Sequence, residues 1–403
     1  MAKYPFIVMI YLFVTILLVC LSLRYDINGK TKYRDECYFV MLVIFILIAG
    51  LRWRLMVDTP SYIYRFYHNT PDFKDFSFED YPIGKDPFYV LLNSIVKSLG
   101  GRFYVVQLIE SAFCNILVFN YIKRHSTYIF TCLFFYAITN YLGLCMETMR
   151  ASFSIVICLY ANDYILNKKW IKGYILYFLA LMFHAEAIVL LILPLFFSIK
   201  LNIKGVLLMF LAFIFGLFLQ NSLGDYVTLL EFSDEIGDKA ASYAESDQFG
   251  DTKGGLGFFL FSKLPYLVYP LLSLLYVKKH NPNSPILKLE PFIMLGVIFV
   301  IIRLNFEIAY RYASYFMVHF LIFYSEFFMG IIHRAKRVDK SVACVKALIS
   351  FFPFFFLVGL AKYVRLDTFY PYSSVIERKI DRKREMRYQH TNKITPAANI
   401  NEY

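Results

Sequence analysis

The sequence lacks the short motifs that mark many metal, nucleotide and hydrolase sites. Its seven cysteines never form a C-x-x-C pair, so neither a zinc site nor a disulfide framework is indicated. It has no Walker A loop, no G-x-S-x-G, no H-E-x-x-H and no D-x-D. The missing D-x-D leaves a glycosyltransferase that uses a metal-bound nucleotide sugar without support. We therefore expect no cofactor and no bound metal.

Charge is also scarce over long stretches of the chain. Apolar residues make up 59% of the 403 positions and the mean hydropathy is +0.53, whereas a soluble domain averages about 45–50% apolar residues. Many stretches of about 17–25 residues hold few charges, which is the length of a membrane-spanning helix. The first, from Pro5 to Leu23, is long for a signal-peptide core and lacks a clear cleavage site, so we keep it as a span. We expect an all-α polytopic membrane protein with about 11–12 transmembrane helices.

Basic clusters between the apolar stretches predict the orientation, because cytoplasmic loops are enriched in Lys and Arg. Placing all of them inside explains the net charge of +12 better than nucleic-acid binding does. The N-terminus is then outside. The clusters are Arg24–Arg34, Lys123–Arg124, Lys168–Lys172, Lys200–Lys204, Lys278–Lys288 and Arg334–Lys340. The expected spans, in one domain over residues 1–361, are 5–23, 38–56, 103–122, 127–146, 150–166, 173–198, 205–220, 256–277, 290–305, 309–330 and 341–361.

The segment 173–198 carries the polar sequence HAEA at 184–187, between two of these basic clusters. Both clusters can be cytoplasmic only if the segment enters the membrane and returns. Such a broken helix is tolerated where it is buried in protein or lines a cavity. A single long tilted helix is the alternative, and the sequence leaves the two open.

Two long segments, 57–102 and 221–255, are expected as loops on the outer, periplasmic side. Each exceeds the usual connector length, and long loops tend to be functional or disordered. The first holds ten aromatic residues between Tyr62 and Tyr89, which favours order. A polar, basic tail over 362–403 follows the last span, and the sequence does not decide on which side it lies.

Ionisable residues at the rim of a span are costly, so each has a partner or a function. Arg52, Arg54 and Asp58 follow the second span on the outer side, where basic residues are normally scarce. Snorkelling arginines at an interface are the structural alternative. Glu147 and Arg150 are three residues apart, so on one helix they would share a face and pair. They form either a structural ion pair or an anion site in which Glu147 orients Arg150.

Two further groups lie in later spans. His184 and Glu186 stand inside the possibly broken segment, where the histidine is either a helix-packing residue or an acid or base. Arg303 and Arg311 are eight residues apart with Glu307 midway, so on one helix the three would form a ladder with an excess of positive charge. All four groups face outward and are rich in arginine, whose planar fork suits phosphate. Tyrosines and Trp53 offer stacking faces for sugar rings. A lipid-linked sugar diphosphate fits such a site, as would other anions.

Five motifs then resemble, in order, those of the EpsG family of Wzy-like polysaccharide polymerases. GLRWRLMVDTPSYIYRF resembles its G-L-R-[YW]-x-x-G-x-D-T-x-x-Y signature, and KDPFYVLLNSIVK its E-P-x-F-x-x-L segment. METMRASFSIVICLYA resembles its E-x-x-R-x-x-x-A helix, LMFHAEAIVLLILPL its F-H-x-S-A-I-x-L helix, and YRYASYF its late R-x-x-x-Y-F element. The matches extend over roughly residues 40 to 320. The chain departs from the pattern at Met56, where Gly is usual, at Asp86, where Glu is usual, and at Glu186, where a small residue is common.

The resemblance implies an inner-membrane enzyme with a GT-C-like helical architecture and its active site facing the periplasm. Such enzymes join oligosaccharide repeat units carried on undecaprenyl diphosphate into exopolysaccharide, capsule or O-antigen. A flippase or transporter of the same lipid-linked oligosaccharide is the main alternative, and a ligase or another membrane glycosyltransferase is a third. We expect the lipid bilayer, a chain-length regulator and a flippase of the same pathway as further partners, and no nucleic acid.

Within that hypothesis each candidate residue has an expected role. Preorganised arginines stabilise the charge that develops on a departing diphosphate without a metal. A general base takes the proton of the attacking sugar hydroxyl. The expected diphosphate ligands are Arg52, Arg150 and Arg311, helped by Arg54 and Arg303; the expected bases are His184 and then Asp58; Glu147, Asp86, Tyr62 and Glu186 would orient arginines or bind sugar hydroxyls.

Overall fold

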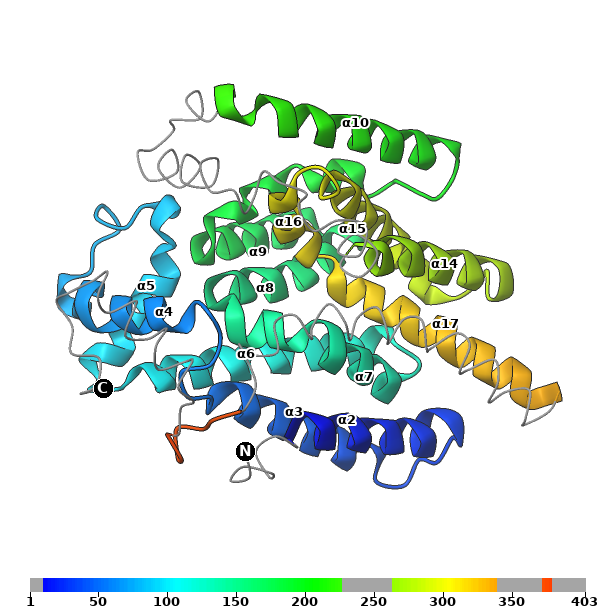
Figure 1. Cartoon of the computed structure of the whole chain (residues 1–403), viewed down its shortest axis with the longest axis horizontal. Coiled ribbons are helices and arrows are strands. Elements are labelled where there is room, and N and C mark those ends of the chain that lie inside the picture. The colour runs from blue at the N-terminus through cyan, green and yellow to red at the C-terminus, as the bar shows by residue number, and fades with distance from the viewer. Residues whose placement is uncertain (1–9, 227–262, 339–371, 379–403) are drawn as a thin grey trace, which may run out of the picture.

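The computed structural model describes residues 10–226, 263–338 and 372–378 (Figure 1). Every regular element in these ranges is a helix, and one isolated bridge joins Arg52 and Ser374. The described part therefore confirms the all-α class. The expected span 341–361 and most of the loop 221–255 lie outside the described residues.

In the first half of the chain, α-helices alternate with short 3₁₀ and π helices. They are α2 (Ile10–Leu21), the π-helical turn η1 (Ser22–Ile27), α3 (Arg34–Gly50), α4 (Thr59–Tyr64), η2 (Arg65–Asn69), η3 (Phe73–Asp75), η4 (Ile83–Lys85), α5 (Pro87–Ser98), α6 (Phe103–His125), α7 (Ile129–Thr139), η5 (Gly143–Glu147), α8 (Met149–Leu166) and α9 (Trp170–Phe183). The second half holds η6 (Ala185–Leu191), η7 (Leu193–Phe196), α10 (Ile203–Tyr226), α14 (Leu264–His280), η9 (Pro285–Leu289), α15 (Glu290–Ile302), η10 (Glu307–Ala309), α16 (Tyr310–Ser314) and α17 (Met317–Val338).

Two expected spans have the wrong boundaries. The span 38–56 ends early, because α3 stops at Gly50 and residues 51–58 are irregular. The span 309–330 is displaced, because the chain first forms the short helix α16 and then begins α17 at Met317. In both places the misassigned residues include arginines, which leave the apolar helix and turn toward other polar groups.

Three helical stretches within the described residues are long and apolar enough to cross a membrane: Ile10–Ile27, Phe103–His125 and Pro285–Ile302. Shorter apolar helices cover Ile129–Thr139, Trp170–Phe183 and Ile203–Leu219. Large apolar side chains remain exposed along their outer faces, for example Phe178, Phe210 and Phe215. Such a continuous apolar exterior is costly in water and suits a lipid environment, so this is a membrane protein.

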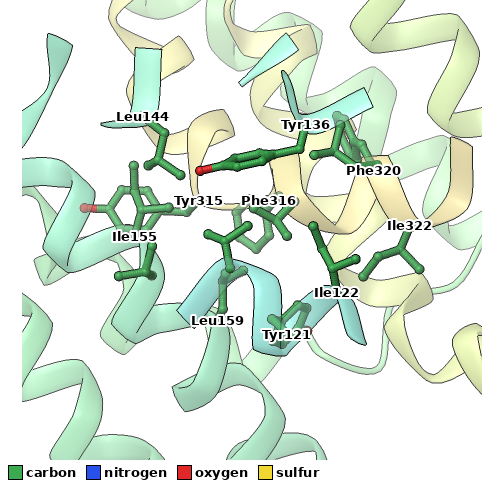
Figure 2. Packing of buried hydrophobic residues seen from close by; sticks show 14 of the residues in the cluster. Tyr121, Ile122, Tyr136, Leu144, Ile155, Leu159, Tyr315, Phe316, Phe320 and Ile322 are labelled. Atoms are coloured by element: carbon green, nitrogen blue, oxygen red, sulfur yellow. The ribbon is translucent and has the colours of Figure 1, made fainter. Parts of the chain in front are cut away.

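The interior is packed with aromatic and branched side chains from α6, α7, α8 and the 315–322 segment (Figure 2). Close approach of two helices depends on one small residue. A Cβ added at Gly296 of α15 would lie 2.6 Å from the ring of Phe320 on α17. Small residues at helix contacts are typical of membrane bundles, where packing rather than hydrophobicity drives association.

Polar contacts gather the basic clusters at one end of the molecule, which we call the basic end. In Figure 1 this end is on the right, where the chain connects α2 to α3 and where α17 ends. The contacts join Lys123 to Asp35 (2.7 Å), His333 to the Asp26 carbonyl (3.1 Å), His125 to Asp163 (2.8 Å), and Glu290 to both Lys278 (2.6 Å) and the Leu201 amide (2.7 Å). The clusters thus occupy one face, as a shared cytoplasmic location requires.

The segment 173–198 is broken rather than a single tilted helix. Helix α9 ends at Phe183, and His184 has an extended backbone with φ −156° and ψ 115°. The following 3₁₀ helices η6 and η7 then return beside α9, since the Tyr174 hydroxyl donates to the Leu191 carbonyl at 3.4 Å. The turn of this hairpin places His184 at the end of the molecule opposite the basic clusters.

Candidate functional site

Five charged or titratable side chains from four separate segments form a continuous chain of contacts, which we call the charged network. Its members, in order of contact, are Arg150, Asp86, His184, Glu186 and Arg311. Arg150 pairs with Asp86, and Arg311 pairs with Glu186. His184 lies between the two carboxylates, with Nδ1 3.5 Å from Asp86 Oδ1 and Nε2 3.3 Å from Glu186 Oε2.

Asp86 is the most buried member, with 4% of its side chain exposed. It directly precedes α5, and its positive φ of 55° is a conformation that Asp adopts more readily than most residues. The Ala185 amide donates to its Oδ1 at 3.0 Å. Burial alone would raise the pKa of the Asp86 carboxyl, but the adjacent His184 imidazole and the charge of Arg150 together hold that pKa below its ordinary value.

The break after α9 creates the second half of the network. In a continuous helix the Ala185 amide would donate to the carbonyl four residues earlier. The break at His184 frees that amide to donate to Asp86 and places the His184 imidazole beside the same carboxylate. Glu186 follows in η6 and meets Arg311 of α16. About 15% of the His184 side chain is exposed, so the imidazole is partly buried yet not sealed from a ligand.

Aromatic side chains cover the Arg150 end of the network. The Arg150 guanidinium lies 5.8 Å from the centre of the Tyr62 ring, a cation–π distance. Tyr62 in turn packs edge-on against Tyr89, with ring centroids 5.9 Å apart. Burial raises the pKa of the Tyr62 phenol, although the charge of Arg150 opposes that rise. Tyr62 is therefore a neutral hydroxyl beside Arg150.

Two expected helix faces do not form. Arg303 and Arg311 do not share a helix face, because α15 ends at Ile302 and α16 begins only at Tyr310. Arg303 lies over the Tyr310 ring at 5.6 Å, while Arg311 pairs with Glu186; the Glu307 side chain lies outside the described residues. Glu147 and Arg150 are likewise on different elements, since Glu147 ends η5 and Arg150 belongs to α8.

Arg52 lies in the protein interior instead of in the network. It faces Glu110 of α6 at 3.8 Å, and neither side chain has any exposed area. Sequence analysis missed Glu110, although an acid inside the expected span 103–122 was a usable signal. Burying an ion pair is expensive unless both groups are partnered. Arg52 therefore points into the core beside α6 and is placed to position the 51–58 stretch rather than to meet a ligand.

The remaining candidates of this stretch lie around a strained turn. Arg54 and Met56 both have positive φ, 48° and 72°, and both are buried. Arg54 lies over the Trp53 ring at 5.1 Å. Asp58 is exposed and directly precedes α4, which carries Tyr62. Met56 thus adopts a backbone conformation that a glycine would adopt without strain.

A short segment late in the chain, residues 372–378, is hydrogen-bonded to the same stretch, and we call it the strap. The Trp53 amide donates to the Ser373 carbonyl and the Val375 amide to the Leu51 carbonyl, both at 2.8 Å. Arg378 also lies over the Trp53 ring at 5.2 Å. The chain therefore returns to the end of α3 after α17 and braces the residues that surround Arg52.

The arrangement places side chains suited to an anion beside a side chain suited to proton transfer. Two guanidiniums each carry a bidentate donor fork suited to phosphate oxygens. An imidazole between them has one nitrogen oriented by Asp86 and the other facing Glu186, as a general base or acid requires. The class defined by fold and site is an all-α membrane protein with a polar, arginine-bearing cluster at one end of its helices.

The comparison with family models gives the particular family. The chain belongs to the EpsG family, whose model matches residues 36–374 and thus most of the chain and the whole charged network. The family is related to Wzy-like polymerases. No curated protein and no solved structure matches the chain.

Proposed function

We propose that the protein joins oligosaccharide repeat units, carried on undecaprenyl diphosphate, into a polysaccharide at the outer face of the bacterial inner membrane. Membership of the EpsG family supports a Wzy-like polymerase at the coarser level. The observation that carries the finer proposal is the charged network. It brings two arginines and a histidine together from three segments, with Asp86 from a fourth, at the end opposite the basic clusters. A GT-C-like architecture is part of the same proposal.

Arg150 and Arg311 bind the diphosphate of the donor in this account. The acceptor hydroxyl oxygen attacks the anomeric carbon, the bond from that carbon to the diphosphate oxygen breaks, and lipid diphosphate leaves with the electron pair. Both guanidiniums then face the oxygens on which negative charge develops, which is where preorganised donors lower the barrier most. Arg52 positions the neighbouring stretch instead of binding the diphosphate.

His184 takes the proton of the attacking hydroxyl. Asp86 fixes the ring through Nδ1, so that Nε2 is the nitrogen that accepts the proton. In the structure Nε2 faces Glu186, and Glu186 pairs with Arg311. When a diphosphate takes the place of Glu186 on Arg311, the carboxylate is released and Nε2 becomes available to the acceptor. Substrate binding and base activation are thereby coupled in one exchange of partners.

Complementation of a deletion strain tests the proposal. Arg150→Ala and His184→Ala proteins that reach the membrane in normal amounts should make no long-chain polymer and should leave single repeat units on the surface. Arg65→Ala and His68→Ala, exposed on the outer loop 57–102 and outside the network, are control substitutions of the same residue types that should restore normal polymer. Long polymer from both network variants would contradict the proposal, and loss of surface repeat units would instead indicate a flippase.

A further inference from the structure

Seven aromatic rings form an unbroken series of contacts that passes the charged network, which we call the aromatic ladder. Successive ring centroids lie 4.7–6.2 Å apart, the range in which aromatic side chains attract one another. The outermost pair is parallel, with an interplanar angle of 6° and a centroid distance of 5.6 Å. From the outside inward the rings are Tyr81, Phe76, Phe78, Phe88, Phe183, Phe153 and Phe113.

The middle rings of the ladder are neighbours of network residues along the sequence. Phe88 stands two residues after Asp86 at the start of α5, and Phe183 directly precedes His184. These two rings are in contact, with centroids 5.7 Å apart. The outer rings are therefore linked through ring contacts to the residues next to Asp86 and His184.

The outer end of the ladder is open to solvent. Phe78 exposes 53% of its surface, and Phe76 and Tyr81 are half-buried. Internal hydrogen bonds hold their turn in place, including those from the Tyr81 amide to the Ser77 carbonyl (3.2 Å) and from the Tyr81 hydroxyl to the Asn69 carbonyl (3.4 Å). Rings that are held in position yet left uncovered mark a binding surface more often than a structural core.

We propose that the outer rings, Phe76, Phe78 and Tyr81, bind the saccharide of the substrate beyond the sugars that react. This inference rests on the proposed function, and it adds a subsite that governs how well the chain is retained between additions. The C–H face of a sugar ring packs on an aromatic face while its hydroxyls stay free to hydrogen-bond. A growing chain held in this way stays beside His184 for the next addition.

The charge of the turn restricts the kind of sugar. Residues 72–81 hold four acids, Asp72, Asp75, Glu79 and Asp80, against one lysine. Carboxylates accept hydrogen bonds from sugar hydroxyls but repel other carboxylates. The subsite therefore suits neutral sugars or amino sugars, and it disfavours uronic acids.

Binding of a lipid-free probe tests the subsite without requiring catalysis. The probe is the set of oligosaccharides released by mild acid from the polymer of the producing strain, added to the full-length protein in nanodiscs and followed by saturation-transfer NMR. Loss of one stacking ring should weaken binding about three- to tenfold in Phe78→Ala, and Phe78→Trp should retain it. Wild-type affinity in Phe78→Ala would overturn the proposal.

Phe73 provides the matched control. It lies on the same turn with the same exposed fraction, 53%, but is not a ring of the ladder. Phe73→Ala should bind the probe as the wild type does. Equal losses in Phe73→Ala and Phe78→Ala would show that the turn contacts the membrane interface instead, and would reject the subsite.

Polymer length provides the second readout. In a complemented strain Phe78→Ala should still form linkages but should shorten the modal chain at least about twofold. If His184→Ala keeps full activity while Phe78→Ala loses probe binding, the proposed chemistry fails and the saccharide subsite stands. If probe binding is unaffected while His184→Ala is inactive, the subsite fails alone.

Discussion

Asp86 organises the candidate site more than any other single residue, because it accepts contacts from Arg150, His184 and the Ala185 amide at once. Its lowered pKa has a consequence for pH. A carboxyl whose folded pKa lies below its unfolded value stabilises the fold above that unfolded value, and the contribution is lost as pH falls through the folded pKa. The network is therefore intact at neutral pH, with Asp86 ionised and unable to act as the acid.

Substitutions of Met56 test the backbone conformation of the turn, again at the level of one residue. Its φ of 72° strains an L-residue, while a glycine would adopt it freely. Both Met56→Gly and Met56→Ala lose a buried side chain, so their difference isolates the backbone. We expect the glycine variant to be the more stable by about 1 kcal/mol, seen as a higher unfolding temperature in detergent. At an ordinary position of an irregular segment, a glycine variant is normally less stable than an alanine variant. A Met56→Gly protein less stable than Met56→Ala would therefore contradict the positive φ assigned to this turn.

Single-residue reasoning predicted most of the network and failed for Arg52. Four of the candidates, Arg150, His184, Glu186 and Arg311, could be identified because each is a costly charge in or beside an apolar run. Asp86 was identified only through the resemblance to the E-P-x-F-x-x-L segment. Which charges pair could not be predicted, since Asp86 and Arg150 are 64 residues apart. Arg52 carried the same signal, but its partner Glu110 directs it inward.

At the scale of elements, the decisive feature is the hairpin formed by α9, η6 and η7. Composition showed a polar break at 184–187, and the basic clusters on both sides would both be cytoplasmic only if the chain returned. Sequence could not choose between a tilted helix and a hairpin, because both bury the same apolar residues. The backbone break at His184 is what brings Ala185, His184 and Glu186 to the network together.

Cysteine labelling tests this hairpin in intact cells. Lys169→Cys and Asn202→Cys, both exposed and at its two ends, should be protected from a membrane-impermeant maleimide until the membrane is permeabilised. Asp72→Cys, on the outer loop, should be labelled at once, and the unsubstituted protein gives the background. Opposite behaviour of positions 169 and 202 would mean that the segment crosses the membrane as one helix.

The whole molecule has two chemically different ends. Helices α3, α8 and α9 each have one end near the basic clusters and the other near the residues of the candidate site. The strap 372–378 also lies at the site end, which sequence could not reveal because those residues are far from position 53 along the chain. Apolar periodicity predicts spans, but only tertiary contacts determine which irregular segments meet between them.

Turnover of a defined substrate by the purified protein tests the central claim most directly. The full-length protein in nanodiscs would receive one synthetic undecaprenyl-diphosphate-linked repeat unit, and products would be separated by size. The account predicts a ladder of polymer products from the wild type. Because an oxyanion-type donor or a general base contributes at least about a hundredfold, Arg150→Ala and His184→Ala should each lose that much rate. A single transfer product, or a full ladder from both variants, would contradict it.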